Sequence, residues 1–223
     1  MELLDPSTHY ELSASLALYT SREGNLMLYW KYHNGQPTSV QAPSSQWIAR
    51  FLQQALKQPT VEFLHPRIIA RGPAFTAWWR PAKPTTMFFT MPALQELSGE
   101  VFPQPPLLFI RRNTTVYVYA LPADERPEPD TPLLYAPYPN YRARDGWVCW
   151  GSGTVPQDAD PEAWEESFFA SAFSHAIDGG HTQGKNLVTL WKGLPRRKRF
   201  PMNRLKDAGK TVASAISNVL KEG

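Results

Sequence analysis

The sequence predicts an α+β fold in which an antiparallel sheet is flanked by helices. Strand-like segments rich in β-branched and aromatic residues are followed by helical patterns, without the regular alternation of a doubly wound sheet. The 22 prolines favour loops and short elements over a helical bundle. With 223 residues, the chain has room for one domain with a core and additional segments.

Residues 1–58 are expected to form an N-terminal hairpin and helix. Residues 13–19 and 26–32 have the pattern of two strands joined by a turn at residues 22–25. Ser44 or Ser45 can then cap a helix, and Pro59 stops it.

Residues 59–194 are expected to form the main body. The strand candidates are residues 68–71, 75–80, 86–90, 107–111 and 116–121. A short helix is expected over 92–97 and an ordered loop over 133–156. A longer helix begins at Asp160 and Pro161, with the aspartate as its cap.

Residues 195–223 are expected to be a basic linker and a loosely attached, amphipathic C-terminal helix over 203–220. Residues 192–223 contain nine Lys and Arg against two Asp and Glu, whereas the formal net charge of the whole chain is +3. The body is therefore acidic, and nucleic acid is an unlikely partner for it. A role in plasmid maintenance through nucleic acid would rest on the basic tail alone, and charge runs of this kind are usually solvated faces or linkers.

The single cysteine excludes an internal disulfide, and the acidic start of the chain does not resemble a signal peptide. No apolar run approaches the roughly 20 residues of a membrane-spanning helix. We therefore expect a cytoplasmic protein without a membrane partner. The five histidines and one cysteine have no zinc-ligand spacing, so neither a metal nor another cofactor is expected.

The most informative segment is residues 135–152, YAPYPNYRARDGWVCWGS. It resembles the active-site flap of ubiquitin-conjugating enzymes, in which His-Pro-Asn precedes a loop, a glycine and a cysteine three residues after that glycine. Pro139 and Asn140 match the Pro-Asn, while Gly146 and Cys149 keep the spacing. The sequence departs from this pattern in having Tyr138 at the histidine and one extra residue in the loop.

Four further motifs resemble PRTRC system protein B, a bacterial ubiquitin-conjugating-enzyme-like family. They are Pro-Pro-Leu-Leu-Phe at 105–109, Leu-Tyr-Ala-Pro at 134–137, Asp-Gly-Trp-Val-Cys at 145–149 and Phe-Phe-Ala-Ser-Ala-Phe-Ser-His at 168–175. The resemblance implies a ubiquitin-conjugating-enzyme-like core within residues 59–194. It also implies two partners, a ThiF-like activating protein and a small ubiquitin-like protein.

The resemblance implies a role for each of five residues. Cys149 would be the thioester nucleophile, and Asn140 would donate a hydrogen bond to the oxyanion. His175 would orient a group or accept a proton, Asp145 would attract a lysine, and Tyr138 would hydrogen-bond the flap or contact a partner. Each has a structural alternative: a buried cysteine, turn residues at Asn140 and Asp145, a packing or capping histidine, and a core tyrosine.

Two functions therefore remain open. The first is an enzyme that carries a ubiquitin-like protein as a thioester on Cys149. The second is a non-catalytic binding module of the same fold, which holds a ubiquitin-like or ThiF-like partner.

Overall fold

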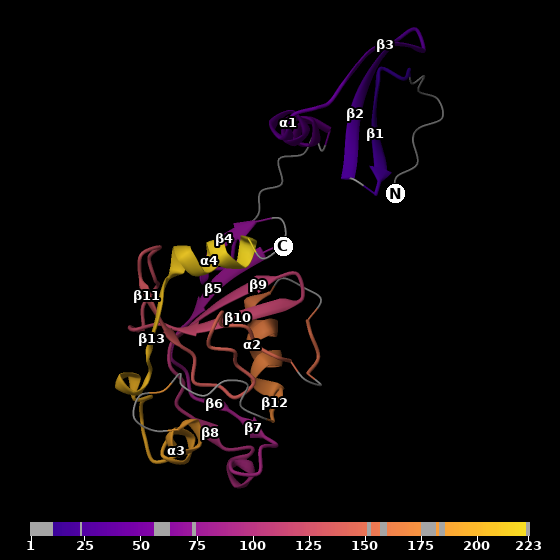
Figure 1. Ribbon diagram of the computed structural model, residues 1–223. Coiled ribbons are helices and arrows are strands. Elements are labelled where there is room, and N and C mark those ends of the chain that lie inside the picture. Colours follow the sequence, from indigo (N-terminus) through magenta and orange to yellow (C-terminus); the bar gives the residue numbers. More distant parts are fainter. Residues whose placement is uncertain are drawn as a thin grey trace. The chain divides into compact units, whose positions relative to one another are not determined.

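The structure of the chain is a computed structural model (Figure 1). It describes residues 11–22, 24–55, 63–72, 75–150, 153–156, 160–174, 182 and 186–221. The chain divides into two compact units, residues 1–62 and 63–223. Each unit is built around its own antiparallel sheet.

The first unit is a three-stranded sheet followed by a helix. Strands β1 (Ala14–Ser21), β2 (Gly24–His33) and β3 (Gln36–Gln41) pair in that order, and α1 covers Ser45–Ala55. The expected hairpin and helix are confirmed, whereas β3 was not expected. Its turn is the dipeptide Asn34-Gly35, whose φ angles of 48° and 73° are typical of a two-residue hairpin turn.

The second unit is built on a six-stranded antiparallel sheet with the order β13-β11-β10-β9-β5-β4. This confirms the α+β class and the antiparallel sheet predicted from the sequence. The strands are β4 (Ile68–Gly72), β5 (Phe75–Arg80), β9 (Leu107–Arg112), β10 (Thr115–Ala120), β11 (Pro132–Tyr135) and β13 (Asp207–Thr211).

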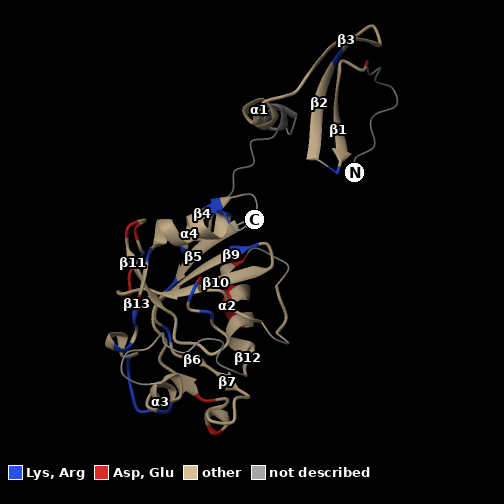
Figure 2. Cartoon of the chain, in the orientation of Figure 1, with Lys and Arg blue, Asp and Glu red and all other residues tan. Residues whose placement is uncertain are grey.

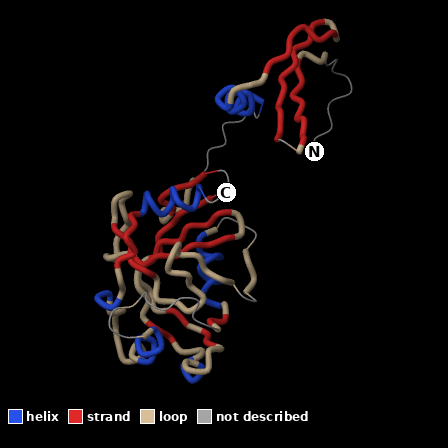
Figure 3. Tube along the Cα trace, in the orientation of Figure 1, coloured by secondary structure: helices blue, strands red, loops and turns tan. Residues whose placement is uncertain are grey.

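Short strands extend this unit at one end (Figure 3). Strands β6 (Thr85–Thr86) and β8 (Val101–Phe102) pair antiparallel, while β7 (Phe88–Phe89) and β12 (Ala172–Phe173) pair in parallel. The remaining elements are helices. They are η1 (Gln95–Leu97), α2 (Pro161–Ala170), α3 (Leu187–Lys192), η2 (Met202–Arg204) and α4 (Val212–Lys221).

Helices α2 and α4 cover opposite faces of the six-stranded sheet (Figure 1). Side chains alternate between the faces of a strand, so neighbouring residues of β10 belong to two different cores. Val116 and Val118 share a core with Trp164 and Phe168 of α2. Tyr117 and Tyr119 belong to the core that contains the buried residues of α4, which are Val212, Ala215 and Val219.

The expectation of one loosely attached helix over 203–220 is wrong. The segment contains η2, then β13, which pairs with β11, and only then α4. Arg112 Nη1 donates a hydrogen bond to the carbonyl oxygen of Val219 at 2.9 Å. A strand is possible here because β11 offers an edge, and β11 itself lies in a segment for which a loop was expected.

The basic stretch that precedes this segment lies between two anchors. Lys and Arg gather on the chain after α3 (Figure 2), in the sequence Arg-Arg-Lys-Arg at residues 196–199. Leu194 on one side is fully buried, and Phe200 on the other is 7% exposed. The cations are therefore held at the surface of the second unit.

Candidate functional site

Residues 140–149 form a closed flap against β10. The Cys149 N–H donates to the carbonyl oxygen of Asn140 at 2.9 Å, which closes the base of the flap. Nearer the tip, the Arg142 N–H donates to the Trp147 oxygen at 2.8 Å. The N–H of Val118 in β10 donates to the Gly146 oxygen at 2.9 Å. These bonds attach the flap to the central part of the sheet.

Cys149 lies at the end of the flap and is a free, partly exposed cysteine. The residues on either side of it are anchored. Val148 is 2% exposed and its N–H donates to the Val116 oxygen at 3.1 Å. The Trp150 ring packs against Trp164 of α2 with 5.7 Å between centroids. The main chain of Cys149 is therefore held in place while the residue keeps contact with solvent.

Asn140 is buried at the base of the flap, with 1% of its surface exposed and φ at +46°. Its Nδ2 donates to the Ala172 oxygen at 3.3 Å, and its Oδ1 accepts from the Ser174 N–H at 3.2 Å. Asparagine tolerates this left-handed conformation better than most residues. Asn140 thus ties the flap to the β12 segment, which is the arrangement expected of a structural turn residue.

Tyr138 lies in the core rather than on a surface that a partner protein contacts. Its side chain is fully buried, and its hydroxyl donates to Gln104 Oε1 at 3.0 Å. The ring packs edge-to-face on Phe168 with 5.0 Å between centroids. Burial raises the pKa of Tyr138, so the hydroxyl stays protonated.

Asp145 fixes the tip of the flap from within. Its carboxylate accepts from Arg142 Nε at 2.8 Å and from the Trp147 N–H at 3.1 Å. The carboxylate is 11% exposed. Burial raises the pKa of Asp145, but the hydrogen bonds from Arg142 and Trp147 outweigh it, and the pKa lies below its usual range.

Gly146 is required by both conformation and space. Its φ is +83°, and a Cβ at this position would lie 2.5 Å from Cζ of Tyr119. The Tyr119 ring cannot move away easily, because the residue is 1% exposed and its hydroxyl donates to the Asp145 carbonyl oxygen. The glycine at position 146 therefore has a structural cause.

Lys210 and Tyr119 support the flap tip, and neither was among the site residues predicted from the sequence. Lys210 Nζ of β13 donates to the Tyr119 hydroxyl at 3.1 Å and to the Arg144 carbonyl oxygen at 3.1 Å. These bonds join the C-terminal strand to the flap, and an open pocket of about 440 Å³ borders them. The only available sequence signal was the alternation along residues 116–121, which places Tyr117 and Tyr119 on one face.

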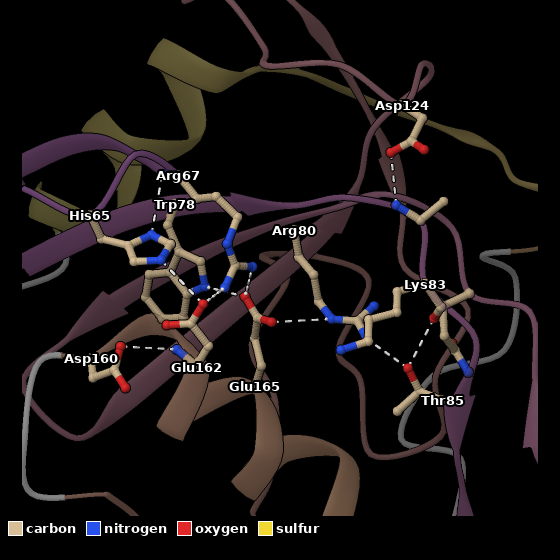
Figure 4. A network of polar contacts seen from close by, with 12 residues as sticks. His65, Arg67, Trp78, Arg80, Lys83, Thr85, Asp124, Asp160, Glu162 and Glu165 are labelled. Atoms are coloured by element: carbon tan, nitrogen blue, oxygen red, sulfur yellow. Dashed lines mark hydrogen bonds and ion pairs between the residues drawn. The ribbon is translucent and has the colours of Figure 1, made fainter.

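A second polar cluster joins α2 to the sheet (Figure 4). Glu165 of α2 accepts from Arg67 Nη1 at 2.5 Å and from the indole N–H of Trp78 at 3.0 Å. Its other oxygen lies 3.2 Å from Arg80 Nε. Glu162, one turn earlier, pairs with Arg67 at 2.7 Å.

Arg80 and Glu165 are the buried part of this cluster, and their burial disfavours the charged forms. The side chain of Arg80 is 5% exposed and that of Glu165 is 10% exposed. Burial raises the pKa of Glu165 and lowers the pKa of Arg80, although each is the ion-pair partner of the other. The cluster fixes α2, which leads directly into the β12 segment that Asn140 binds.

His175 lies outside the described residues. Within the described part of the chain, no three His, Cys, Asp or Glu side chains are grouped as metal ligands. None of the helices in that part has both the length and the apolarity needed to cross a bilayer.

The comparisons with known proteins identify the family. Searches of curated proteins and of solved structures found no significant match. The family model described as prokaryotic E2 family D matches residues 45–208. The match begins at α1 and includes the flap, Cys149 and the α2 cluster, which agrees with the resemblance to bacterial conjugating-enzyme-like proteins. The chain belongs to prokaryotic E2 family D, whose members have a ubiquitin-conjugating-like role.

Proposed function

We propose that Cys149 accepts a small ubiquitin-like protein as a thioester from a ThiF-like activating protein. The observation that carries this proposal is the placement of the one cysteine of the chain. It is partly exposed at the end of a flap whose base is closed by the bond from its own N–H to Asn140. An acyl-transfer nucleophile needs both access and a fixed position.

The step is a transthioesterification. The Cys149 thiolate attacks the carbonyl carbon of the thioester on the activating protein, and a new carbon–sulfur bond forms. The old carbon–sulfur bond then breaks, and the thiolate of the activating protein leaves. No net oxidation occurs. The proton lost from Cys149 passes to solvent or to a nearby base.

Asn140 enters this step if one of the two N–H donors of its side-chain amide points toward the oxyanion. In the structure its Nδ2 is bonded to the Ala172 oxygen. Release of that bond would also free a donor at the base of the flap, next to the main chain of Cys149. In either case Asn140 would contribute to the oxyanion site, as the resemblance implies.

A second candidate is a binding module in which Cys149 has no chemistry. It is favoured by the same observation on Asn140, whose amide nitrogen and oxygen each bond to the β12 segment. In this case the flap and its support by Asp145 and Lys210 would form a rigid docking surface for a ubiquitin-like or ThiF-like protein.

The experiment mixes the protein with its ThiF-like and ubiquitin-like partners and ATP, and resolves the products on a non-reducing gel. We expect an adduct that a thiol reductant removes. Cys149→Ser should give an adduct that resists the reductant, and Cys149→Ala should give none. Asn140→Ala should slow formation by about 10²–10³-fold if it supplies the oxyanion donor.

Two outcomes reject the enzyme. One is no adduct with the wild-type chain while the partners bind it, which supports the module. The other is an adduct that persists in Cys149→Ala. An adduct whose rate is unchanged by Asn140→Ala keeps the enzyme and leaves Asn140 a structural role.

A further inference from the structure

The first unit contains a strand whose apolar side chains are left uncovered. In β1, Leu16 and Leu18 are 40% and 62% exposed, and Tyr19 is 49% exposed. Among the described residues from 11 to 50, no side chain is fully buried. The described residues of this unit therefore bury little apolar surface, and small units of this kind are commonly stabilised by association.

The two outer strands of this sheet have opposite patterns. Strand β1, with the sequence ASLALYTS, is apolar on both faces, since Leu16 and Leu18 lie on one face and Ala17 and Tyr19 on the other. This pattern is typical of a strand inside a sheet. Strand β3, with the sequence QPTSVQ, is mostly polar and contains Pro37, as edge strands commonly do. The pattern therefore indicates that the sheet ends at β3 and continues beyond β1.

The free edge of β1 has main-chain groups available for pairing. The Tyr32 N–H donates to the Ser13 oxygen at 2.9 Å. Bonding alternates along an antiparallel pair, so the main chains of Leu16 and Leu18 face away from β2. Within the described residues, no strand pairs with this side of β1.

We propose that two copies of this chain associate through β1, each strand pairing antiparallel with its counterpart across a two-fold axis. Two three-stranded sheets then become one six-stranded sheet with β1 at its centre. The registers that overlap the strand most fully place Ala17 or Leu18 on the axis.

The partner that pairs with β1 is expected to be a second copy of this chain, because the strand lacks charge. Strand β1 contains no Lys, Arg, Asp or Glu, and in Figure 2 it carries no charged residue along its length. Identical strands can therefore lie side by side without like-charge repulsion, which normally protects edges against self-pairing. In the register centred on Ala17, Leu16 of each copy lies opposite Leu18 of the other, so the most exposed side chain gains an apolar neighbour.

This association lies outside the conjugating-enzyme-like core. The family match begins at residue 45, after β3 has ended at Gln41. The proposal does not depend on chemistry at Cys149, and its tests contain no activating or ubiquitin-like protein.

The first test is a cysteine trap in the full chain carrying Cys149→Ser. Ala17→Cys or Leu18→Cys should form a disulfide-linked dimer under mild oxidation, because residues opposite each other across a pair have Cα atoms about 4.5–5.5 Å apart. Leu12→Cys is the matched control. Leu12 is 56% exposed, close to the 62% of Leu18, but it would lie more than about 30 Å from its counterpart. Equal cross-linking at all three positions indicates random collision and overturns the proposal.

The second test measures the molar mass by light scattering. The wild-type chain should show about twice the 25.3 kDa of one chain. Leu18→Lys places two cations close to the axis and should return the mass to that of one chain. Val40→Lys, on β3 and 48% exposed in the wild type, should leave the dimer intact. A monomeric wild-type chain, or dissociation by Val40→Lys but not by Leu18→Lys, overturns pairing through β1.

Discussion

Strands β1 and β10 have similar patterns of apolar residues but differ in how far the chain pairs with and buries them. ASLALYTS and TVYVYA both place apolar or aromatic side chains on both faces. In β10, five of the six residues are buried, because β9 and β11 pair with its edges and two cores cover its faces. In β1, no residue is fully buried, and among the described residues β2 alone pairs with it. The two strands thus have similar patterns, but the described part of the chain covers both edges and both faces only for β10.

The flap depends on the complete surroundings of β10. It binds β10 through Val116 and Val118, while its tip is supported by Tyr119 and by Lys210 of the next-but-one strand. A cysteine on a flap supported in this way keeps its position without a bound ligand. The first unit shows no comparable arrangement among its described residues.

The largest expected loss of stability comes from truncating the second unit. Deleting residues 207–223 removes β13 and α4 and uncovers the face of the sheet that contains Tyr117 and Tyr119. Losing the buried side chains of α4 and β13 should cost at least about 5 kcal/mol in the free energy of unfolding. For a chain of this size that corresponds to a fall in the melting temperature of more than about 10 °C.

Deleting residues 1–62 is the matched truncation. It removes the whole first unit and none of the buried core of the second. The melting temperature of the main thermal transition should change by less than about 3 °C, close to 1 kcal/mol. Circular dichroism of both truncated chains measures this contrast. A large loss of stability on removing 1–62 would show that the second unit depends on the first.

The sequence predicted the local elements well and the long-range pairing poorly. The cap at Asp160 was predicted, and its carboxylate accepts from the Glu162 N–H at the start of α2. The strand over Phe75–Arg80 was also predicted with its observed bounds. Strand β13 was missed because its pairing with β11 joins residues far apart in the sequence, and its own residues have no strong β pattern.

The candidate site shows the same limit. Pro139-Asn140 and the spacing of Gly146 and Cys149 identified the flap, which local main-chain bonds close. Sequence alone could not show that Tyr138 is buried or that Asn140 binds the β12 segment. Glu165 was missed for a related reason, since an isolated glutamate on a helix is normally exposed.

The next largest loss of stability is expected at Glu165. It compares a buried ion pair with an exposed one on the same helix. Glu165→Ala leaves Arg80 buried without its carboxylate and should cost about 3–5 kcal/mol in the free energy of unfolding. Glu162→Ala is the matched control, because its side chain is 50% exposed, and it should cost at most about 1 kcal/mol. Urea unfolding of both variants measures the difference. Equal effects would contradict the role of the buried cluster in fixing α2.

The smallest expected change in stability concerns Asp145 in the flap, which we compare with the Asn34-Gly35 turn of the first unit. The turn is formed by backbone conformation, whereas the flap also needs the charge of Asp145. The pKa of this carboxyl is lower in the folded chain than its usual value near 3.9. Asp145 therefore stabilises the fold fully above the unfolded pKa, and this contribution is lost as the pH falls through the folded pKa.

Asp145→Asn should consequently lower the melting temperature by a constant amount between pH 7 and about pH 5, with the gap closing below about pH 4. The measurement is the melting temperature of both chains from pH 7 to pH 3. Asp124→Asn is a suitable control, because Asp124 accepts a hydrogen bond from the Ala82 N–H at an exposed position away from the flap. A gap that persists unchanged at pH 3 would mean that Asp145 supports the flap through shape and hydrogen bonding alone, since the charge would then be irrelevant. In that case the flap would resemble the Asn34-Gly35 turn, and the contrast between the two loops would disappear.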